Sequence, residues 1–465
     1  MDRTLISATR DHVGHEVRLC GWIHATRRMG KMVFIDLRDV SGLVQAVFLP
    51  DNKPLLEQAQ SLRPEFVVEV VGQVNERPKK LVNKEMLTGT VEIQAHALKV
   101  LAESKTPPFE IVETEKEEVG EEVRYRYRYL DLRRAHNRDR ILRRSRAIKF
   151  IRDYLHERGF VEIETPILAK STPEGARDYL VPSRQYEGKF YALPQSPQQY
   201  KQMLMVAGFD KYFQIAPCFR DEDARGDRAP DQFYQLDLEM SFIEQADILD
   251  LTEKLFTAMV QAVFPEKHMT FGTWPRISYD EAMKKYSTDK PDLRKDKNDP
   301  NELAFCFIVD WPLFEPEMED GHYAPAHHIF TAPRTEDIPL LDSDPSQARS
   351  WQHDLALNGY EVGGGSIRIT DPQLQEKVLG LVGISQSEAR EQFGHMLEAF
   401  QYGVPPHGGI APGIDRMLMV LLNAPNVREV VAFPKTGDNR EPMTGSPSSV
   451  SEQQLKDLHI QLRRK

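Results

Sequence analysis

The sequence contains little cysteine and no long uninterrupted apolar run. Its three cysteines, Cys20, Cys218 and Cys306, lie far apart, and none belongs to a C-x-x-C pair. This spacing encodes neither a disulfide framework nor a thiolate zinc site. No stretch approaches the roughly 20 apolar residues that a membrane-spanning helix needs, and the N-terminus lacks a signal-peptide pattern. The sequence therefore predicts a cytoplasmic protein with no membrane partner.

An excess of positive charge is also missing. The chain has 60 Lys and Arg against 71 Asp and Glu, which gives a formal net charge of −11 over 465 residues. That balance argues against a protein that coats nucleic acid indiscriminately, because such binding relies on many cations neutralising phosphates. Residues 124–146, RYRYRYLDLRRAHNRDRILRRSR, are the exception and predict a local basic face.

The phosphate-binding loops of the common nucleotide folds are absent as well. The segment EVGGGSIRI, residues 361–369, has no Lys-Ser or Lys-Thr after its glycines and precedes no helix, so it matches neither the P-loop nor the dinucleotide fingerprint. A nucleotide would therefore have to be held by arginines. Arg220 directly follows the apolar segment KYFQIAPCF, where a guanidinium can be aimed at a phosphate; the alternative is an exposed charged loop. Arg416 lies where glycines lead into a helix N-terminus, which favours anions; the alternative is an ordinary helix start with Asp415 in its first turn.

The first hundred residues are rich in short segments with period-two alternation of apolar residues, which is typical of strands. A short helical pattern with Pro54 near its start lies between the third and fourth segments. Five strands with a helix after the third is the order of an OB barrel, whose strands and loops bind single-stranded nucleic acid. Another small β-barrel or sandwich is the alternative. The five segments begin at Val17, Met32, Leu43, Phe66 and Val91.

A Pro- and Glu-rich stretch follows, and with the basic segment it predicts a hinge over residues 105–135. The next helix has Ile141, Ile148, Ile151 and Leu155 on one face and ends at Gly159. Beyond it, strand and helix patterns alternate, and several strands follow one another without a crossover helix. Residues 136–465 therefore predict a mixed α+β domain with a substantial antiparallel sheet.

Three polar segments of this domain predict a cleft. In ALPQSPQQYKQML, Ser196 is expected at a helix N-cap with Gln199 completing a capping box, but capping does not explain Lys201. His327 and His328 are adjacent, so on a regular strand they would lie on opposite faces. They also lack the cysteines or the H-E-x-x-H pattern of a zinc site. Glu361 and Arg368 are seven residues apart, so they would lie on opposite faces of a regular strand unless the intervening glycines form a bulge.

Taken together, these segments resemble the class II aminoacyl-tRNA synthetases, and within them the bacterial type of aspartyl-tRNA synthetase. GFVEIETPIL resembles motif 1, which ends at Pro166; FRDEDARGDRAPDQFYQLDLE resembles motif 2; and GIAPGIDRML resembles motif 3. STPEGARDYLVPSR, ALPQSPQQYKQ, HHIFTAP and NGYEVGGGSIRI resemble the aspartate-specific segments, and RRMGKMVFIDLRD resembles the N-terminal domain of that type. The resemblance covers essentially the whole chain. It implies an OB-fold anticodon-binding domain (1–104), the hinge, and a catalytic domain (136–465) built on an antiparallel sheet flanked by helices.

The resemblance also implies an activity: ATP-dependent activation of L-aspartate to aspartyl-adenylate, then transfer to the 3′ end of tRNA(Asp), with Mg²⁺ as cofactor. Arg220 would contact the α-phosphate and Arg416 the γ-phosphate, and these two are the expected catalytic residues. The expected ATP-binding residues are Arg220, Asp221, Glu222, Glu361, Gly413, Ile414, Asp415 and Arg416. The expected aspartate-binding residues are Glu174, Ser196, Gln198, Lys201, Arg220, Gln235, Asp237, His327 and Arg368. Asp354 and Glu361 would bind Mg²⁺, and Arg27, Phe34 and Gln45 would read the anticodon.

Lys201 and Arg368 are expected to grip the side-chain carboxylate of aspartate. This pair argues against a sister synthetase for lysine, whose substrate wants acids there, and against one for asparagine, whose substrate wants no excess positive charge. Arg368→Leu is expected to leave the fold intact and to impair aspartate activation strongly. A non-catalytic tRNA-binding paralogue remains the alternative from another class, although it would be expected to lack Arg220 or Arg416.

Three further features bear on the resemblance. The bacterial enzymes usually carry a large inserted domain near residues 295–302, where this chain has only KDKNDPNE, so the tRNA contacts of that domain are expected to be lost. Ala229 replaces a glutamine that lies beside ATP in many relatives. Met29, in a loop that influences tRNA choice, favours the strict form that does not charge tRNA(Asn). A homodimer is expected through the segment around Pro166.

Overall fold

This computed structural model describes residues 1–112, 119–172, 176–222 and 231–463. The chain divides into two compact units, Met1–Val119 and Gly120–Lys465. No helix in the described ranges is both long enough and apolar enough to cross a bilayer.

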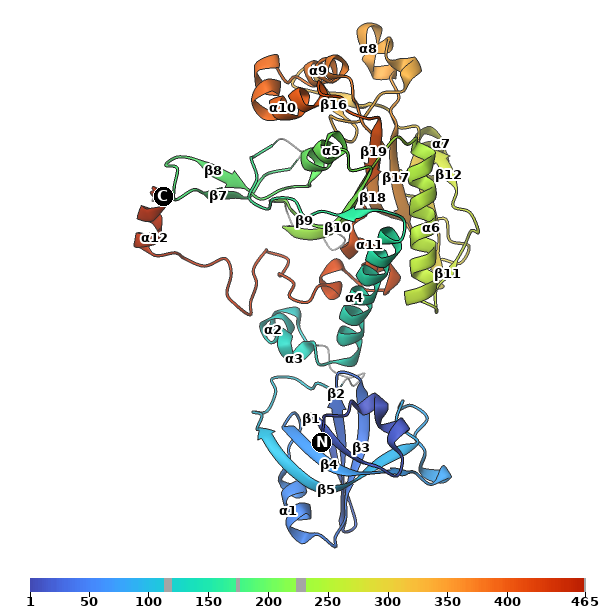
Figure 1. The fold of residues 1–465 in the computed structure, drawn as a ribbon, viewed down its shortest axis with the longest axis vertical. Coiled ribbons are helices and arrows are strands. Elements are labelled where there is room, and N and C mark those ends of the chain that lie inside the picture. The colour runs from blue at the N-terminus through green and yellow to red at the C-terminus, as the bar shows by residue number, and fades with distance from the viewer. Residues whose placement is uncertain (113–118, 173–175, 223–230, 464–465) are drawn as a thin grey trace. The chain divides into compact units, whose positions relative to one another are not determined.

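The first unit is a closed five-stranded barrel with the strand order β1-β2-β3-β5-β4 (Figure 1). Alternation along β1 places Val17, Leu19 and Ile23 in the barrel core. Helix α1 follows β3 and is capped by Asn52, whose side chain accepts the backbone N–H of Leu55. The predicted OB barrel is confirmed. Its elements are η1 Ile6–His12, β1 Glu16–Met29, β2 Met32–Asp39, β3 Gly42–Phe48, α1 Lys53–Ser61, β4 Val67–Glu76, η2 Lys79–Leu81 and β5 Val91–Ala102.

The second unit is built on an eight-stranded sheet with the order β12-β14-β17-β18-β19-β10-β9-β6. The inner pairs are antiparallel, and only the pairs at the two edges are parallel. This arrangement confirms the predicted α+β class with an antiparallel sheet. The strands are β6 Val161–Glu162, β9 Lys211–Phe219, β10 Gln232–Ser241, β12 Arg276–Ser278, β14 Phe305–Val309, β17 Gln352–Leu357, β18 Tyr360–Ile367 and β19 His407–Ile410.

Three helices cover one face of this sheet and enclose the main core. Their apolar residues pack with Leu236, Leu238 and Met240 of β10, which alternation turns to this side. On α4, Ile151 and Leu155 are buried, as the sequence periodicity predicted. The helices are α4 Ala135–His156, α6 Gln245–Val263 and α11 Ile414–Leu421.

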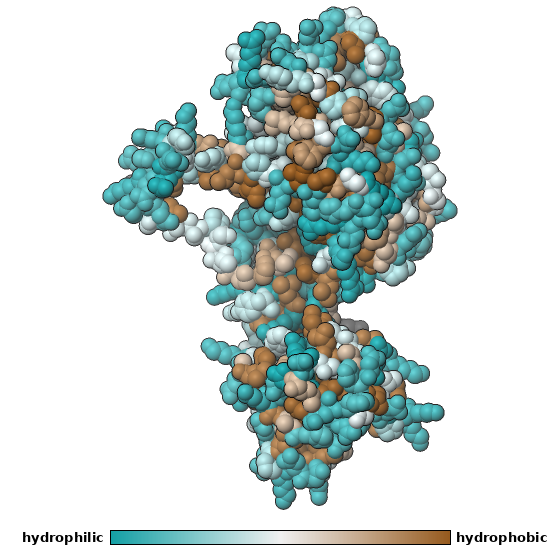
Figure 2. Space-filling view, viewed as in Figure 1, coloured by the Kyte–Doolittle hydropathy of each residue, from teal (hydrophilic) through white to brown (hydrophobic). Residues whose placement is uncertain are grey.

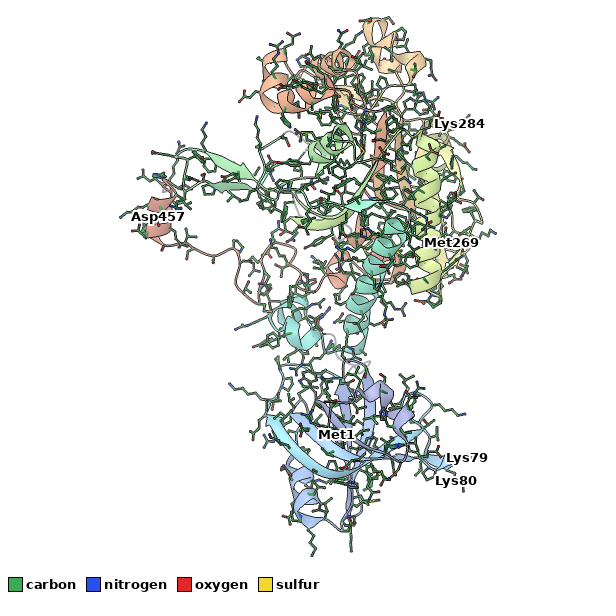
Figure 3. The ribbon with its side chains drawn as sticks, in the orientation of Figure 1. Met1, Lys79, Lys80, Met269, Lys284 and Asp457 are labelled. Atoms are coloured by element: carbon green, nitrogen blue, oxygen red, sulfur yellow. The ribbon has the colours of Figure 1, made fainter. Side chains whose placement is uncertain are left out.

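The remaining elements surround the sheet. The hairpin β7–β8 stands away from it (Figure 1), and Leu180 and Phe190 of this hairpin are exposed. Apolar surface, coloured brown, is visible in several places in Figure 2. Lys79 and Lys80 of η2 in the first unit and Asp457 of α12 point outward (Figure 3). These elements are α2 Glu121–Arg126, α3 Arg128–Asp131, β7 Leu180–Pro182, β8 Phe190–Ala192, α5 Gln198–Val206, β11 His268–Met269, α7 Tyr279–Tyr286, β13 Glu302–Leu303, β15 Phe314–Glu319, β16 His322–Pro325, η3 Thr335–Asp337, α8 Leu340–Ser343, η4 Pro345–Gln347, α9 Pro372–Leu381, α10 Gln386–Phe400, η5 Val427–Val430 and α12 Glu452–Asp457.

The arginines of the predicted basic face bind acids of their own unit. Asp131, which is fully buried, pairs with Arg128 at 2.5 Å and with Arg124 at 3.2 Å. Arg124 also reaches Glu429 at 2.8 Å, and Arg140 contacts the same carboxylate at 3.1 Å. Much of this basic segment therefore forms an internal network that joins α2, α3 and α4 to η5.

Candidate active site

The sheet face opposite the three helices carries polar side chains. On β10 the alternation that buries Leu236 and Leu238 turns Gln235, Asp237 and Glu239 to this face. A cavity of about 290 Å³ opens beside them. Its lining brings together predicted site residues from several elements: Ser196, Gln198, Lys201, Arg220, Gln235, Asp237, His327, Glu361, Arg368, Gly413, Asp415 and Arg416.

Four buried charged residues, which we call the floor, contact one another at this cavity: Lys201, Asp237 and Arg368, which line it, and Glu239, which lies behind them. The Lys201 ammonium lies 2.5 Å from an Asp237 oxygen and 3.4 Å from Glu239. The Arg368 guanidinium donates to both oxygens of Glu239, at 2.9 and 3.2 Å. The expected excess of positive charge is therefore wrong, because two acids match the two cations.

Burial and pairing act differently on the two acids. Burial raises the pKa of Asp237, against the opposing effect of Lys201. Burial also disfavours ionisation of Glu239, but Arg368 and Lys201 together outweigh it and lower the pKa of Glu239 to about 2. One oxygen of Asp237, Oδ2, is buried and has no hydrogen-bond partner among the described residues. It is an acceptor available to a cationic group of a ligand.

Two arginines approach the cavity from different motifs. Arg220 follows β9, its backbone N–H donates to the Asp231 carbonyl at 3.0 Å, and its guanidinium lies 5.0 Å from the centre of the Phe233 ring. Its Nε is buried without an acceptor in the described ranges. Arg416, on the first turn of α11, donates to the backbone carbonyl of Glu361. The stacking and the backbone contacts hold both guanidinium groups at the cavity.

Asp415 uses both carboxylate oxygens within the protein. Oδ2 accepts the backbone N–H of Tyr234 at 3.0 Å, and Oδ1 forms an ion pair with Arg144 of α4. Tyr234, Asp415 and Val427 also line a second cavity, of about 800 Å³, along α4. These three residues therefore form a wall between the candidate site and the α4 groove, by which name we refer to this second cavity.

Asp354 and Glu361 lie on the neighbouring strands β17 and β18. The pairing of these strands slips by one residue at Val362, so the bulge considered from the glycines is present and Glu361 and Arg368 line the same cavity. Burial, followed by the charge of Glu361, raises the pKa of Asp354 well above its usual value. Asp354 Oδ1 lies under Gly364, where an added Cβ would come within 2.9 Å of it. Within the described ranges, no group of three or more His, Cys, Asp and Glu forms a metal cluster.

Both adjacent histidines line the cavity, although strand alternation would have separated them. Desolvation, followed by the charges of Arg368, Lys201 and Arg220, lowers the pKa of His327 to about 3, so the ring is neutral at pH 7. His328 Nδ1 accepts the backbone N–H of Phe330 at 3.3 Å, which leaves the proton on Nε2. That Nε2 has no partner among the described residues.

Several predicted residues lie elsewhere. Four predicted residues do not line the cavity: Asp221, Glu222, Ile414 and Asp354. Ile414 packs in the core, and the backbone N–H of Asp221 donates to the Arg177 carbonyl while Arg177 Nε donates to the Asp221 carbonyl. Glu174 and Ala229 lie outside the described residues. Ser196 is not the N-cap of α5, since that position is Pro197, but Ser196 Oγ accepts the backbone N–H of Gln198 at 3.3 Å. Glu239 was missed from the sequence, although the period-two rule on β10 could have found it. His328 was placed in a segment of the cleft but was not assigned to the aspartate-binding residues.

The predicted anticodon residues share one region of the barrel surface. Arg27 of β1 pairs in register with Phe34 of β2, and its guanidinium contacts Asp36 at 2.9 Å and Gln45 at 3.4 Å. Gln45 in turn donates to Glu92 at 3.2 Å. The region combines a half-buried aromatic ring with an exposed cation and amide groups, which suits an unpaired base.

Comparison with known proteins places both units. Residues 120–437 match the family model "tRNA synthetases class II (D, K and N)", and residues 17–101 match "OB-fold nucleic acid binding domain". An "Aspartate--tRNA(Asp/Asn) ligase" of Rubrobacter xylanophilus is 43% identical over 97% of this chain and 95% of its own length. The chain belongs to the aspartate–tRNA ligase family of class II synthetases. An "Aspartate--tRNA ligase" of Staphylococcus haemolyticus is 39% identical to this synthetase over 98% of both chains.

The solved structures support the fold of this synthetase. The asparaginyl-tRNA synthetase of Pyrococcus horikoshii, solved with asparaginyl-adenylate, superposes with a TM-score of 0.76 at 24% identity and covers 95% of this chain and 100% of its own. The alignment with the Rubrobacter relative spans 574 positions, whereas this synthetase has 465 residues, so at least 109 residues of the relative have no counterpart here. The Rubrobacter relative is therefore longer than this synthetase, whereas the Pyrococcus structure is similar to it in length.

The short connection before β14 is tightly closed. The carboxylate of Glu302 is nearly buried and accepts the backbone N–H groups of Lys295 and Asp296 at 3.0 and 2.8 Å. The Thr270 hydroxyl donates to the same carboxylate at 2.8 Å. One side chain thus ties the two ends of the turn at 295–302.

Proposed function

We propose that this synthetase activates L-aspartate with ATP to form aspartyl-adenylate, and then transfers the aspartyl group to the 3′ end of tRNA(Asp). The proposal rests chiefly on one observation: the donor-rich floor and the two arginines Arg220 and Arg416 meet in a single cavity. The floor offers N–H groups to a side-chain carboxylate, and the arginines offer charge to phosphates.

In the first step, the α-carboxylate of aspartate attacks the α-phosphorus of ATP, the bond to the bridging oxygen breaks, and pyrophosphate leaves. No side-chain nucleophile is needed, because a carboxylate is already ionised at neutral pH. Arg220 would stabilise the negative charge that develops on the α-phosphate, and Arg416 would hold the γ-phosphate so that the leaving group lies in line. In the second step, a ribose hydroxyl of the tRNA attacks the activated carbonyl and AMP leaves.

The amino-acid end is proposed to bind against the floor. Lys201 and Arg368 donate to the side-chain carboxylate, and Asp237 Oδ2 accepts from the α-ammonium. Ser196, Gln198, Gln235 and the neutral ring of His327 line the remaining wall. Selectivity against asparagine then follows from hydrogen-bond direction rather than from net charge, since the floor is electrically balanced.

Asp354 and Glu361 fit a divalent cation. The two carboxylates lie on adjacent strands, and the raised pKa of Asp354 shows that nearby positive charge does not compensate it. Mg²⁺ is commonly held by one or two carboxylates together with substrate phosphates. When bound, it would neutralise phosphate charge.

The tRNA that is charged is part of the proposal. Arg27, Phe34 and Gln45 are proposed to read the anticodon, with Phe34 stacking on a base. A second candidate, charging of tRNA(Asn) as well, is favoured by the name of the Rubrobacter relative, an aspartate–tRNA(Asp/Asn) ligase. Met29, exposed at the β1–β2 turn, supports the strict form instead. Aminoacylation of purified tRNA(Asp) and tRNA(Asn) in parallel decides between them.

We also propose a cytoplasmic homodimer that forms through the segment around Pro166 and the α4 groove. Val161, Ile167 and Leu168 are 45%, 48% and 52% exposed, and Phe433 at the groove is 53% exposed. Such exposed apolar residues are typical of an interface. Sedimentation at micromolar concentration should give twice the chain mass, and a monomer contradicts the proposal.

The activity is tested by exchange of labelled pyrophosphate into ATP without tRNA, with aspartate, asparagine and lysine as separate substrates. Exchange with aspartate alone is expected. Exchange with asparagine or lysine would favour a sister synthetase. No exchange with any of the three, with or without added tRNA, would favour a non-catalytic tRNA-binding protein.

A further inference from the structure

Arg368 presents a defined edge of its guanidinium to the cavity. A guanidinium has five N–H groups in one plane. The Nε group and one group on Nη2 donate to Glu239, at 2.9 and 3.2 Å, and one group on Nη1 donates to Ser366 Oγ at 2.7 Å. Each terminal nitrogen carries two hydrogens, so one N–H group remains on Nη1 and one on Nη2 without an acceptor among the described residues. Arg368 itself lines the cavity.

The two residues that hold this guanidinium are themselves fixed. Both Glu239 and Ser366 are fully buried, and neither lines the cavity. Glu239 also contacts Lys201 at 3.4 Å, and Ser366 Oγ accepts from the Thr331 hydroxyl at 3.3 Å. Both therefore act on a ligand only through a neighbour.

We propose that Glu239 and Ser366 are positioning residues that set the preference for aspartate over asparagine. They hold Arg368 so that its two remaining N–H groups form a donor-only edge. A side-chain carboxylate accepts from both groups. A carboxamide has one oxygen and one NH₂ group, so its NH₂ would meet another N–H group and leave buried donors unsatisfied. This inference rests on the proposed function of the cavity. It assigns the selectivity of the cavity to Glu239 and Ser366, which do not line it.

A purely electrostatic role for Glu239 predicts the opposite result. The floor contains two cations, Lys201 and Arg368, and two acids, Asp237 and Glu239. Replacing Glu239 with glutamine makes the floor more positive by one charge, which by itself should strengthen the binding of an anionic side chain. Positioning predicts weaker binding instead, because the amide offers only one acceptor and no charge to the guanidinium. The sign of the effect therefore separates the two roles.

The test is steady-state pyrophosphate exchange by the full chain, with KM and kcat measured for aspartate, asparagine and ATP. Glu239→Gln is expected to raise the KM for aspartate roughly a hundredfold. Ser366→Ala, which changes no charge, is expected to raise it roughly tenfold. In both variants the KM for ATP should stay within about twofold, and the aspartate-to-asparagine ratio of kcat/KM should fall. A lower or unchanged KM for aspartate in Glu239→Gln overturns the proposal, and so does an unchanged ratio in Ser366→Ala.

Folding and function are separated by two controls. Thr252→Val removes another buried hydroxyl, which bonds within α6 on the helix-covered side of the sheet, and it should leave both KM values and the ratio unchanged. If Glu239→Gln does not fold, Ser366→Ala decides alone, because it removes a single oxygen atom. If the wild type shows aspartate-dependent exchange and both variants have the same KM and selectivity as the wild type, only the positioning role is overturned. Absence of that exchange in the wild type overturns the proposed function, and this inference with it.

Discussion

The barrel and the catalytic unit, residues 120–465, differ in what their interiors contain. The barrel interior is filled by apolar side chains from all five strands, and its buried ion pair, Arg38 with Glu65, joins residues 27 positions apart. In the catalytic unit, the buried pair of Arg368 with Glu239 joins residues 129 positions apart, and the partly buried pair of Arg124 with Glu429 joins residues 305 positions apart. Desolvation opposes the burial of such charges unless their partners are in place. The catalytic unit therefore depends on contacts that exist only when the whole domain has assembled.

This difference follows what each unit is proposed to bind. A stacked base needs a shaped surface with an aromatic ring, which an apolar barrel can support. Aspartate and triphosphate need fixed charges in a place where water is restricted. Substitutions of the floor charges should therefore impair substrate activation, whereas substitutions on the barrel surface should impair tRNA binding alone.

The largest effect is expected for Arg368→Leu. Pyrophosphate exchange with aspartate should fall at least about a thousandfold, on the order of 4 kcal/mol, because the floor loses its donor edge. The variant is still expected to fold, but Glu239 would lose both hydrogen bonds to the guanidinium, so the unit should be less stable. Exchange assays and chemical denaturation measure the two effects. Near-normal turnover of aspartate by the variant would show that Arg368 does not bind the substrate.

The next effect concerns stability alone. Asp131→Asn leaves the buried guanidinium of Arg128 without its counter-charge, so the unfolding free energy of the catalytic unit should fall by roughly 3–5 kcal/mol. Calorimetry should show that only the transition of that unit moves, while the transition of the barrel stays.

The matched control is Asp153→Asn on α4. Its partner Lys149 and Asp153 are exposed, with side-chain exposures of 74% and 56%. The change should be within about 0.5 kcal/mol. Equal effects of the two substitutions would contradict the difference between buried and exposed pairs.

A pH dependence of about 3 kcal/mol is expected from Glu239. Its pKa is about 2 in the folded protein against a usual value of 4.5, so its contribution to stability is complete above pH 4.5 and is lost as the pH falls toward 2. The stability difference between the wild type and Glu239→Gln should therefore be constant from pH 5 to 8 and shrink below pH 4.5. Denaturant titrations at several pH values measure it. A difference that stays constant down to pH 2.5 would show that Glu239 is not held ionised by the floor.

The smallest of these effects lies in the barrel. Phe34→Leu should raise the KM for tRNA in aminoacylation roughly tenfold, because the lost stacking amounts to about 1–3 kcal/mol per base. Pyrophosphate exchange without tRNA should not change. Val40→Ala, at an exposed position on the same barrel, serves as the control. A loss of exchange in Phe34→Leu would mean that the barrel substitution disturbs the catalytic unit.

The sequence predicted the barrel well because its signals are local. Period-two alternation and the proline-started helix are both readable within a few residues, and both are present. The same rule applied to β10 would have added Glu239 to Gln235 and Asp237. The arginine-rich segment was interpreted as a basic face because its partner at Glu429 is about 300 residues away and no spacing rule connects them. Likewise, the two contacts of Asp415 with Arg144 and Tyr234 depend on how three elements pack, which no single motif encodes.

The turn closed by Glu302 bears on how such enzymes can gain or lose a whole domain. Its ends are already held together by one carboxylate, so a segment added there starts and finishes at nearly the same point. Loop-closure entropy grows only with the logarithm of length, and lengthening a connection from about 8 to about 110 residues costs about 2 kcal/mol. A folded module can therefore be gained or lost at this position while the sheet beneath it is unchanged. For protein engineering, the turn is an insertion site at which a reporter or a second RNA-binding domain can be added to the catalytic unit.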